Sequence, residues 1–131
     1  MPRKVTTFLM FEGVATEAMN LYVSLFGGSE IQQVERYGPG EQGAEGTVKR
    51  ASFTLAGQEF LCIDSPIKHG FTFTPSISLF VECDSEAEFE AAFSRLSDGG
   101  SVLMPVGNYG FSTKFGWLSD RYGVSWQLNL E

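Results

Sequence analysis

The last extended segment of the sequence, residues 123–130, alternates uncharged polar side chains with apolar ones. Ser125, Gln127 and Asn129 fall on one side of such a strand, whereas Trp126 and its apolar neighbours fall on the other. Hydroxyl and amide groups suit a half-enclosed surface, where a full charge would be costly to bury but a hydrogen bond is still useful. The pattern is compatible with a small-molecule binding surface, and an ordinary solvent-facing strand is the alternative.

The remaining residues that could do chemistry are scattered along the chain. The sequence shows no nucleophile–base pair, no phosphate-binding loop and no paired-carboxylate motif. Asp64 follows an extended segment and precedes a Ser-Pro dipeptide, so we expect it to cap a turn; a general base at the mouth of a pocket is the alternative. His69, the single histidine, is more typical of a packing or surface residue than of a metal ligand. Tyr109 lies in a glycine-flanked loop, residues 107–111, that could close over a ligand.

Composition and charge narrow the classes of partner. A length of 131 residues predicts a single domain, 1–131, with a core of its own. The net charge of −7 argues against nucleic acid and anionic membranes as partners, because no basic stripe could neutralise phosphates. The sequence has neither an apolar run of the ~20 residues that a membrane span needs nor a secretory signal, so we expect a cytoplasmic location. Cys62 and Cys83 lie in apolar runs, as reduced core residues do.

The elements that must position these residues occur twice in the same order. In the first half, an extended segment is followed by a predicted helix at 15–26, whose apolar residues recur at helical spacing up to Gly27-Gly28. In the second half, a predicted helix at 85–97 ends at Gly99-Gly100. The extended segments are expected at 5–13, 29–37, 47–55 and 58–64 in the first half, and at 76–83, 101–107, 112–119 and 123–130 in the second.

Each half therefore reads as strand–helix–strand–strand–strand. The repeated units span about 5–64 and 76–130, and the proline-bounded segment 65–75 links them. We expect an α+β fold in which two βαβββ units form a curved mixed sheet around a concave pocket. Ser125, Gln127 and Asn129 would face that pocket, while Trp126 would pack beneath a helix.

Two stretches resemble a known family. FLMFEGVATEAMNLYVSLFGGSEI, at 8–31, resembles the aromatic strand, "EA…FY…FGG" helix and following strand of the PhnB-like branch of the vicinal oxygen chelate (glyoxalase/bleomycin resistance/dioxygenase) superfamily. FGWLSDRYGVSWQL, at 115–128, resembles the "D-x-F/Y-G-x-x-W" hairpin of that branch. Members of the branch are often labelled 3-demethylubiquinone-9 3-methyltransferase-like. The sequence nevertheless lacks the glycine-rich turn and downstream acidic residue of an S-adenosylmethionine site.

The resemblance implies a metal site that this sequence does not reproduce. The superfamily holds a metal with four residues, usually His, Glu or Gln, and the matching positions are Thr7, Arg50 or its neighbour, Ser76 and Gln127. Only Gln127 is a plausible ligand, because hydroxyls bind metals weakly and a guanidinium repels a cation. We therefore expect no metal and no cofactor, and the residues of any catalytic step are unknown.

The positions at which the sequence lacks the superfamily's metal ligands are still expected to line a pocket. By strand alternation Thr7, Leu9 and Phe11 would share a face with Arg50, Ser52 and Thr54, and with Ser76, Ser78 and Phe80. Arg50 could pair bidentately with a carboxylate or phosphate, or it could instead extend into solvent from an edge strand. The expected ligand-binding residues are Thr7, Leu9, Arg50, Ser52, Ser76, Ser78, Tyr109, Ser125 and Gln127.

Two functions fit these expectations. The favoured one is metal-independent binding or sequestration of a small, neutral or anionic organic molecule between the two units, as in bleomycin-resistance relatives. The alternative is an enzyme acting on a small metabolite, of lyase, isomerase or transferase type, that uses Arg50, Gln127 or Asp64 in place of a metal. A homodimer is also expected, because 12 phenylalanines, Phe71 and Phe73 among them, exceed the needs of one small core. Whether units would be exchanged between chains is left open.

Overall fold

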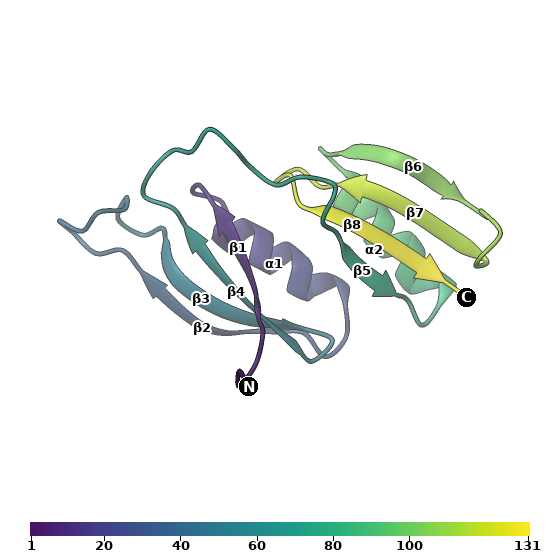
Figure 1. Ribbon diagram of the computed structural model, residues 1–131, viewed down its shortest axis with the longest axis horizontal. Helices are drawn as coiled ribbons and strands as arrows, with labels where there is room; N and C mark the ends of the chain where they lie inside the picture. Colours follow the sequence, from purple (N-terminus) through teal and green to yellow (C-terminus); the bar gives the residue numbers. More distant parts are fainter. The chain divides into compact units, whose positions relative to one another are not determined.

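Each half of the chain folds into one four-stranded mixed sheet with a single helix on one of its faces (Figure 1). The computed structural model describes residues 1–131, which divide into unit 1, Met1–His69, and unit 2, Gly70–Glu131. The expected α+β fold of two βαβββ units is confirmed by this order of elements. No helix is long and apolar enough to cross a membrane.

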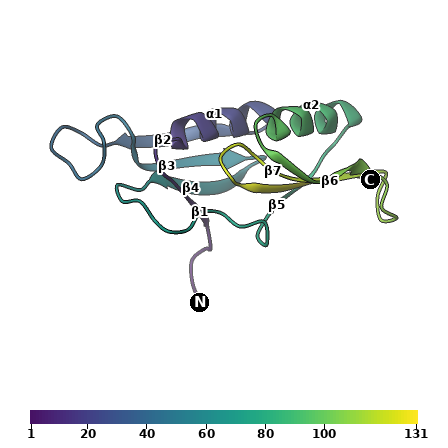
Figure 2. The same ribbon diagram turned by 90° about the horizontal axis from the view of Figure 1, so that it is seen from above.

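Unit 1 is built on a sheet with the strand order β1-β4-β3-β2. β1 pairs with β4 in parallel, and the other two pairings are antiparallel. The helix lies against one face of this sheet (Figure 2), where its side chains at helical spacing, Ala15, Ala18, Met19 and Tyr22, are buried. The elements are β1 (Thr7–Phe11), α1 (Ala15–Leu25), β2 (Glu30–Arg36), β3 (Val48–Leu55) and β4 (Gln58–Asp64).

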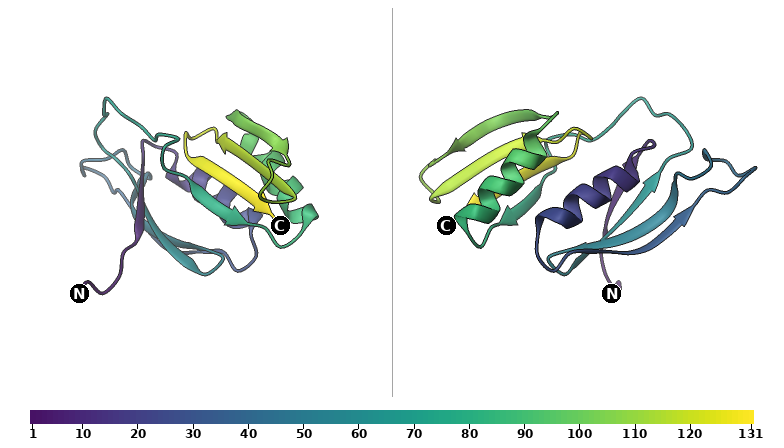
Figure 3. Two further views of the ribbon diagram at one scale, coloured as in Figure 1. Left: turned by 45° about the vertical axis from the view of Figure 1, so that its right-hand side comes forward. Right: turned by 180° about the vertical axis from the view of Figure 1, so that it is seen from behind.

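Unit 2 repeats this arrangement with the strand order β5-β8-β7-β6. Its helix likewise covers one face of its own sheet (Figure 3) and buries Phe89, Ala92 and Leu96. Gly116 lies directly beneath this helix, since a Cβ built there would come within 2.3 Å of the Phe93 ring. The elements are β5 (Leu79–Glu82), α2 (Glu86–Ser97), β6 (Ser101–Gly107), β7 (Lys114–Ser119) and β8 (Ser125–Leu130).

The core of each unit lies between its helix and its sheet. In unit 1 the Phe53 and Phe60 rings stack with centroids 5.3 Å apart, and Tyr22 of α1 lies against Phe53. In unit 2 Trp126 and Leu128 of β8 are fully buried, as expected for the apolar side of this strand. Burial of such side chains is the main stabilising contribution to each unit.

The first strand of unit 2 is shorter than expected. The sequence predicted a strand over 76–83, but β5 begins only at Leu79. Ile77 donates its backbone N–H to the Thr74 carbonyl, so the chain turns there instead of pairing. Pro75 is the second residue of this turn, a position that its fixed φ favours, and the turn delays the start of the strand.

The two helices begin in different ways. Ser85 caps α2 locally: its Oγ accepts the Glu88 N–H at 3.1 Å, and the Glu88 carboxylate accepts the Asp84 N–H at 3.0 Å. Val14, at the corresponding position before α1, offers no side-chain cap. The cap of α1 comes instead from Asp64, at the end of β4.

Candidate functional site

The side of each sheet opposite its helix, here called the helix-free face, carries the polar residues singled out in the sequence. Cross-strand register assigns the faces. In unit 2, Gly116 beneath α2 pairs with Leu128, so Gln127 and Asn129 on either side of Leu128 belong to the helix-free face. The expectation that Ser125, Gln127 and Asn129 lie opposite the buried Trp126 is confirmed.

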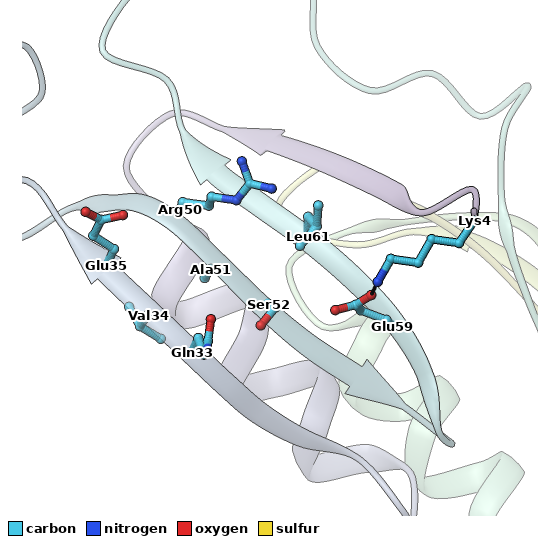
Figure 4. Close-up of a pocket in the computed structure, with 9 residues that line it drawn as sticks. All are labelled: Lys4, Gln33, Val34, Glu35, Arg50, Ala51, Ser52, Glu59 and Leu61. Carbon is cyan, nitrogen blue, oxygen red and sulfur yellow. Dashed lines mark hydrogen bonds and ion pairs between the residues drawn. The ribbon is translucent and has the colours of Figure 1, made fainter. Parts of the chain in front are cut away.

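A pocket of about 650 Å³ lies on the helix-free face of unit 1 (Figure 4). Arg50 and Ser52 of β3 line it together with Leu61 of β4. Ser52 pairs with Leu61 on one side and with Gln33 on the other, so these side chains point to the same face. The full lining is Lys4, Gln33, Val34, Glu35, Arg50, Ala51, Ser52, Glu59 and Leu61.

Arg50 is the unpaired cation of this pocket. β3 lies between β4 and β2, so Arg50 does not extend from an edge strand. A β-bulge at Lys49 shifts the register beside Arg50, and Val48 beyond the bulge turns back to the helix side, where it is buried. Lys4 forms an ion pair with Glu59, whereas Arg50 forms none, although Glu35 is its cross-strand neighbour. The guanidinium is thus available to an incoming anion.

Thr7 and Leu9 do not share this face, contrary to the sequence-based expectation. β1 pairs with β4 so that Thr7 lies beside Phe60, Leu9 beside Cys62 and Phe11 beside Asp64, all on the side of α1. The helix-free side of β1 is formed by Phe8 and Met10, beside Leu61 and Ile63. The segment is apolar from Phe8 to Phe11, so strand alternation offered no way to tell its two sides apart.

The helix-free face of unit 2 carries a hydrogen-bonded network around Ser125. The Ser125 hydroxyl lies 2.6 Å from that of Ser78 and accepts the Trp117 indole N–H at 2.9 Å. Gln127 Nε2 donates to the Ser78 hydroxyl at 3.2 Å. The structure therefore brings three of the expected site residues, Ser78, Ser125 and Gln127, into direct contact. Their polar groups satisfy one another.

Ser76 is not part of this network. It lies in the exposed turn before β5, where its hydroxyl is 3.2 Å from that of Thr74. The expectation that Ser76 belongs to a strand is wrong for the same reason that β5 starts late.

Tyr109 and Phe111 lie in the loop between β6 and β7. Both rings meet the Phe115 ring edge to face, with centroids at 5.9 and 5.0 Å respectively. The Tyr109 hydroxyl donates to the Pro105 carbonyl at 2.6 Å, which holds this side of the loop in place. Phe115 is the cross-strand neighbour of Asn129, so the loop reaches the helix-free face of unit 2.

Asp64 is a structural carboxylate. It is buried on the helix side of unit 1 and accepts three backbone N–H groups, from Gly13 at 2.8 Å, Ala15 at 3.0 Å and Val48 at 2.9 Å. The expectation that Asp64 caps the turn that follows it is wrong: its carboxylate caps α1, which is distant in sequence, and in the turn itself the Ser65 hydroxyl accepts the Ile67 N–H. A general base at a pocket mouth does not match this position, because both carboxylate oxygens are already engaged with the backbone.

The two cysteines and the histidine are not part of the polar groups described above. Cys62 and Cys83 are buried and unpaired, as expected. Burial, with a smaller contribution from Asp64, raises the pKa of the Cys62 thiol to about 12, and burial raises the pKa of the Cys83 thiol to about 11. Both therefore stay protonated at neutral pH. His69 Nε2 lies 2.9 Å from the Ser65 hydroxyl in the segment after β4.

The residues at the four positions implied by the superfamily do not fit a metal ion. Thr7 lies on the helix side of its sheet, Arg50 is a cation and Ser76 is in an exposed turn. Gln127 alone has a suitable oxygen. No three His, Cys, Asp or Glu side chains gather anywhere in the chain to hold a metal. A donor set of this kind is too weak for the metals that the superfamily uses.

Sequence reasoning missed the residues of β2 and β4 that complete the unit 1 pocket. Gln33 and Glu35 alternate along β2, and Glu59 and Leu61 alternate along β4. The same alternation that placed Arg50 and Ser52 would have found them once the strand order was known. Lys4 precedes β1, and no sequence signal marked it.

Comparison with known proteins gives consistent matches along the whole chain. A family model described as 3-demethylubiquinone-9 3-methyltransferase matches residues 3–129. A Bacillus cereus PhnB protein, with the proposed label 3-demethylubiquinone-9 3-methyltransferase, is 59% identical; the match covers 98% of this chain and 100% of that one, with a TM-score of 0.96. A Pseudomonas aeruginosa protein is 28% identical over 99% of this chain and 98% of its own, with a TM-score of 0.85.

A more distant neighbour shows the same fold. The genomically encoded fosfomycin resistance protein FosX of Listeria monocytogenes is 12% identical, with a TM-score of 0.63 over 100% of this chain and 94% of that one. At this identity the likeness concerns the fold alone. No curated protein matches the chain.

Proposed function

This chain belongs to the 3-demethylubiquinone-9 3-methyltransferase family, the PhnB-like branch of the vicinal oxygen chelate superfamily, and we propose that it binds or sequesters a small anionic organic molecule without a metal. The proposed site is the pocket on the helix-free face of unit 1. The observation that carries the proposal is the Arg50 guanidinium, which lines this pocket and has no ion-pair partner.

The chemistry of the lining fits such a ligand. A guanidinium can donate two parallel hydrogen bonds to one carboxylate or phosphonate, which gives both affinity and orientation. Ser52 and Gln33 lie on the same face and can bond further polar groups, while Leu61 offers an apolar contact. The pocket volume of about 650 Å³ falls within the range of small-molecule sites.

The methyltransfer reaction named in the family's description is not part of this proposal. The sequence lacks an S-adenosylmethionine motif, and the buried Asp64 carboxylate is not free to act as a base, because it is bonded to three backbone N–H groups. Binding through Arg50 needs neither a methyl donor nor a base. We therefore expect affinity to be unchanged when metals are removed with a chelator.

The test is a thermal-shift and calorimetric screen of small carboxylates and phosphonates, with benzoate compared with neutral benzamide. A ligand at ~100 times its dissociation constant should stabilise the fold by about 2.7 kcal/mol. Arg50→Gln should weaken anion binding about tenfold or more, since a charge-assisted bidentate bond is lost. The anion affinity of Arg50→Lys should lie between those of the wild type and Arg50→Gln, because a lysine keeps the charge but lacks the planar guanidinium.

Arg95→Gln is the matched control. Arg95 is an exposed arginine near the end of α2 in unit 2, remote in sequence from the pocket residues. Its removal should leave anion binding within twofold of wild type. If no anion stabilises the wild-type chain more than it stabilises the Arg50→Gln variant, the proposal is wrong.

We also propose that the protein is a homodimer. Several large aromatic side chains remain exposed, among them Phe8, Phe71, Phe80 and Phe111. Aromatic residues are enriched at subunit contacts, and closed two-fold pairs are the commonest oligomers.

A further inference from the structure

Glu35 is a second charged group of the unit 1 pocket that has no ion-pair partner within the chain. It lies on β2 and lines the pocket beside Arg50, its cross-strand neighbour on β3. Oppositely charged residues at directly opposed positions of a sheet attract each other, yet neither of these side chains forms an ion pair. The pocket therefore holds a free carboxylate as well as a free guanidinium.

The other cations near Glu35 are engaged elsewhere. Lys49 of β3 forms an ion pair with Glu41 at 2.6 Å. Glu41 is the main cause of the raised pKa of the Lys49 ammonium, and Glu35 contributes less. Arg36, which follows Glu35 along β2, donates to the Thr16 hydroxyl of α1 at 2.9 Å. The Glu35 carboxylate is therefore available to a ligand.

The side chains of Arg50 and Glu35 extend in different directions. Figure 4 shows the Arg50 guanidinium extending across β4 in the direction of Leu61, whereas Glu35 stays on β2. Neighbouring strands lie about 4.8 Å apart, and β3 lies between β4 and β2. A small molecule with two opposite charges at the ends of a short chain could bridge the two groups.

The charges of the lining also disfavour a second anionic group on the ligand. Lys4 is the only other cation of the lining, and it is paired with Glu59. A ligand that binds Arg50 through one anionic group finds no further free cation in the pocket. A second negative group would instead meet the field of Glu35, which repels it.

We propose that the ligand of this pocket is an amino acid or a related amino carboxylate, whose carboxylate binds Arg50 and whose ammonium group binds Glu35. The inference rests on the function proposed above, in which Arg50 holds the anionic group, and it adds the chemical class of the ligand. Glu35 selects ligands that carry a positive charge and rejects those that carry a second negative one.

The experiment compares three probes that differ only at one end. The probes 4-aminobutyrate, pentanoate and glutarate share a carboxylate and the same methylene chain, and they end in an ammonium, a methyl and a second carboxylate respectively. Each is titrated calorimetrically into the full chain at low ionic strength, where exposed charges are least screened. We expect 4-aminobutyrate to bind about threefold more tightly than pentanoate, as for a solvent-exposed charge pair. Glutarate, despite its two carboxylates, should bind no more tightly than pentanoate.

Substitutions of Glu35 test the assignment directly. Glu35→Gln removes the charge at nearly constant size and should abolish the preference for 4-aminobutyrate over pentanoate. Glu35→Lys should reverse the order, so that glutarate binds more tightly than 4-aminobutyrate. Glu30→Gln is the matched control, because Glu30 is an exposed glutamate of the same strand outside the pocket lining; it should leave the affinity ratios unchanged. Pentanoate binding by each variant shows that the pocket is intact.

The outcomes separate this inference from the proposed function. If pentanoate binding depends on Arg50 but the ratio of the 4-aminobutyrate and pentanoate affinities is the same in the wild type and in Glu35→Gln, only the inference is wrong. If Arg50→Gln binds all three probes as the wild type does, the function proposed for Arg50 is wrong, and the inference falls with it. If the wild type binds none of the three, the inference is again wrong, and the comparison of benzoate with benzamide decides the proposed function separately.

Discussion

Asp64 joins three segments of unit 1 that are far apart in the sequence. Its carboxylate accepts the N–H groups of Gly13 and Ala15 at the start of α1 and of Val48 at the start of β3. Asp120 plays a related part in unit 2, where it accepts the N–H groups of Tyr122 and Val124 and the indole N–H of Trp126. Both buried carboxylates are thus used to satisfy donors, which is a role in stability.

Replacing Asp64 by Asn should lower the free energy of unfolding by about 3 kcal/mol, because the new amide N–H₂ would face a backbone donor and a charged acceptor would be lost. Chemical denaturation followed by far-ultraviolet circular dichroism measures the change. Asp98→Asn, at an exposed carboxylate, should stay within about 0.5 kcal/mol of wild type. An equal effect of the two substitutions would contradict the structural role of Asp64.

For single residues, the sequence predicted the sheet face correctly in strands that alternate polar and apolar side chains, and incorrectly in a uniformly apolar strand. Ser125, Gln127, Arg50 and Ser52 were assigned to the correct faces because polar and apolar residues alternate around them. Leu9 was not, because it is flanked by Phe8 and Met10 and only pairing with β4 decides its side. The free carboxylate of Glu35 depends on the partners that the neighbouring cations take, so no sequence pattern could reveal it.

Among the elements, the hairpin between β3 and β4 carries local strain. Its two turn residues, Ala56 and Gly57, both have positive φ, at 50° and 86°. Such turns favour Asn-Gly, since alanine pays a steric cost in the left-handed region. Ala56 N also donates to the Ser29 hydroxyl, a bond that any residue except proline would keep.

Ala56→Asn should therefore raise the free energy of unfolding by about 0.5–1 kcal/mol. The midpoint of thermal or denaturant unfolding reports the gain. Ala44→Asn provides the comparison, because Ala44 is exposed in a loop and has no positive φ. A stabilisation of the same size at both positions would show that strain in the hairpin is not the cause.

The helix and strand order could be predicted because each element has its own local signals. The glycine pairs after the helices and the Ser85 cap are visible in the sequence, and Gly28 and Gly99 do adopt positive φ. The late start of β5 could not be predicted in the same way, since the apolar pattern of 76–83 continues through a turn that Pro75 favours.

For the whole molecule we expect a dimer of about twice the chain mass of 14.4 kDa. Multi-angle light scattering at micromolar concentration measures this mass directly. Phe71→Glu should shift the population towards monomer if exposed rings form the contact, because a carboxylate cannot be buried there without a partner. Val5→Glu, at an exposed position outside any strand, should leave the mass unchanged. A monomer that persists at high concentration would overturn the dimer.

The difference between the two helix caps has a consequence for the time at which each helix is stabilised during synthesis. The Ser85 cap of α2 lies three residues from its donor and is complete as soon as the first turn has formed. The Ala15–Asp64 bond spans 49 residues, so α1 must wait for β4 before it is capped. At about 5–20 residues per second on the ribosome, that wait lasts roughly 2–10 seconds. During this time the apolar face of the nascent α1 has no finished sheet to cover it.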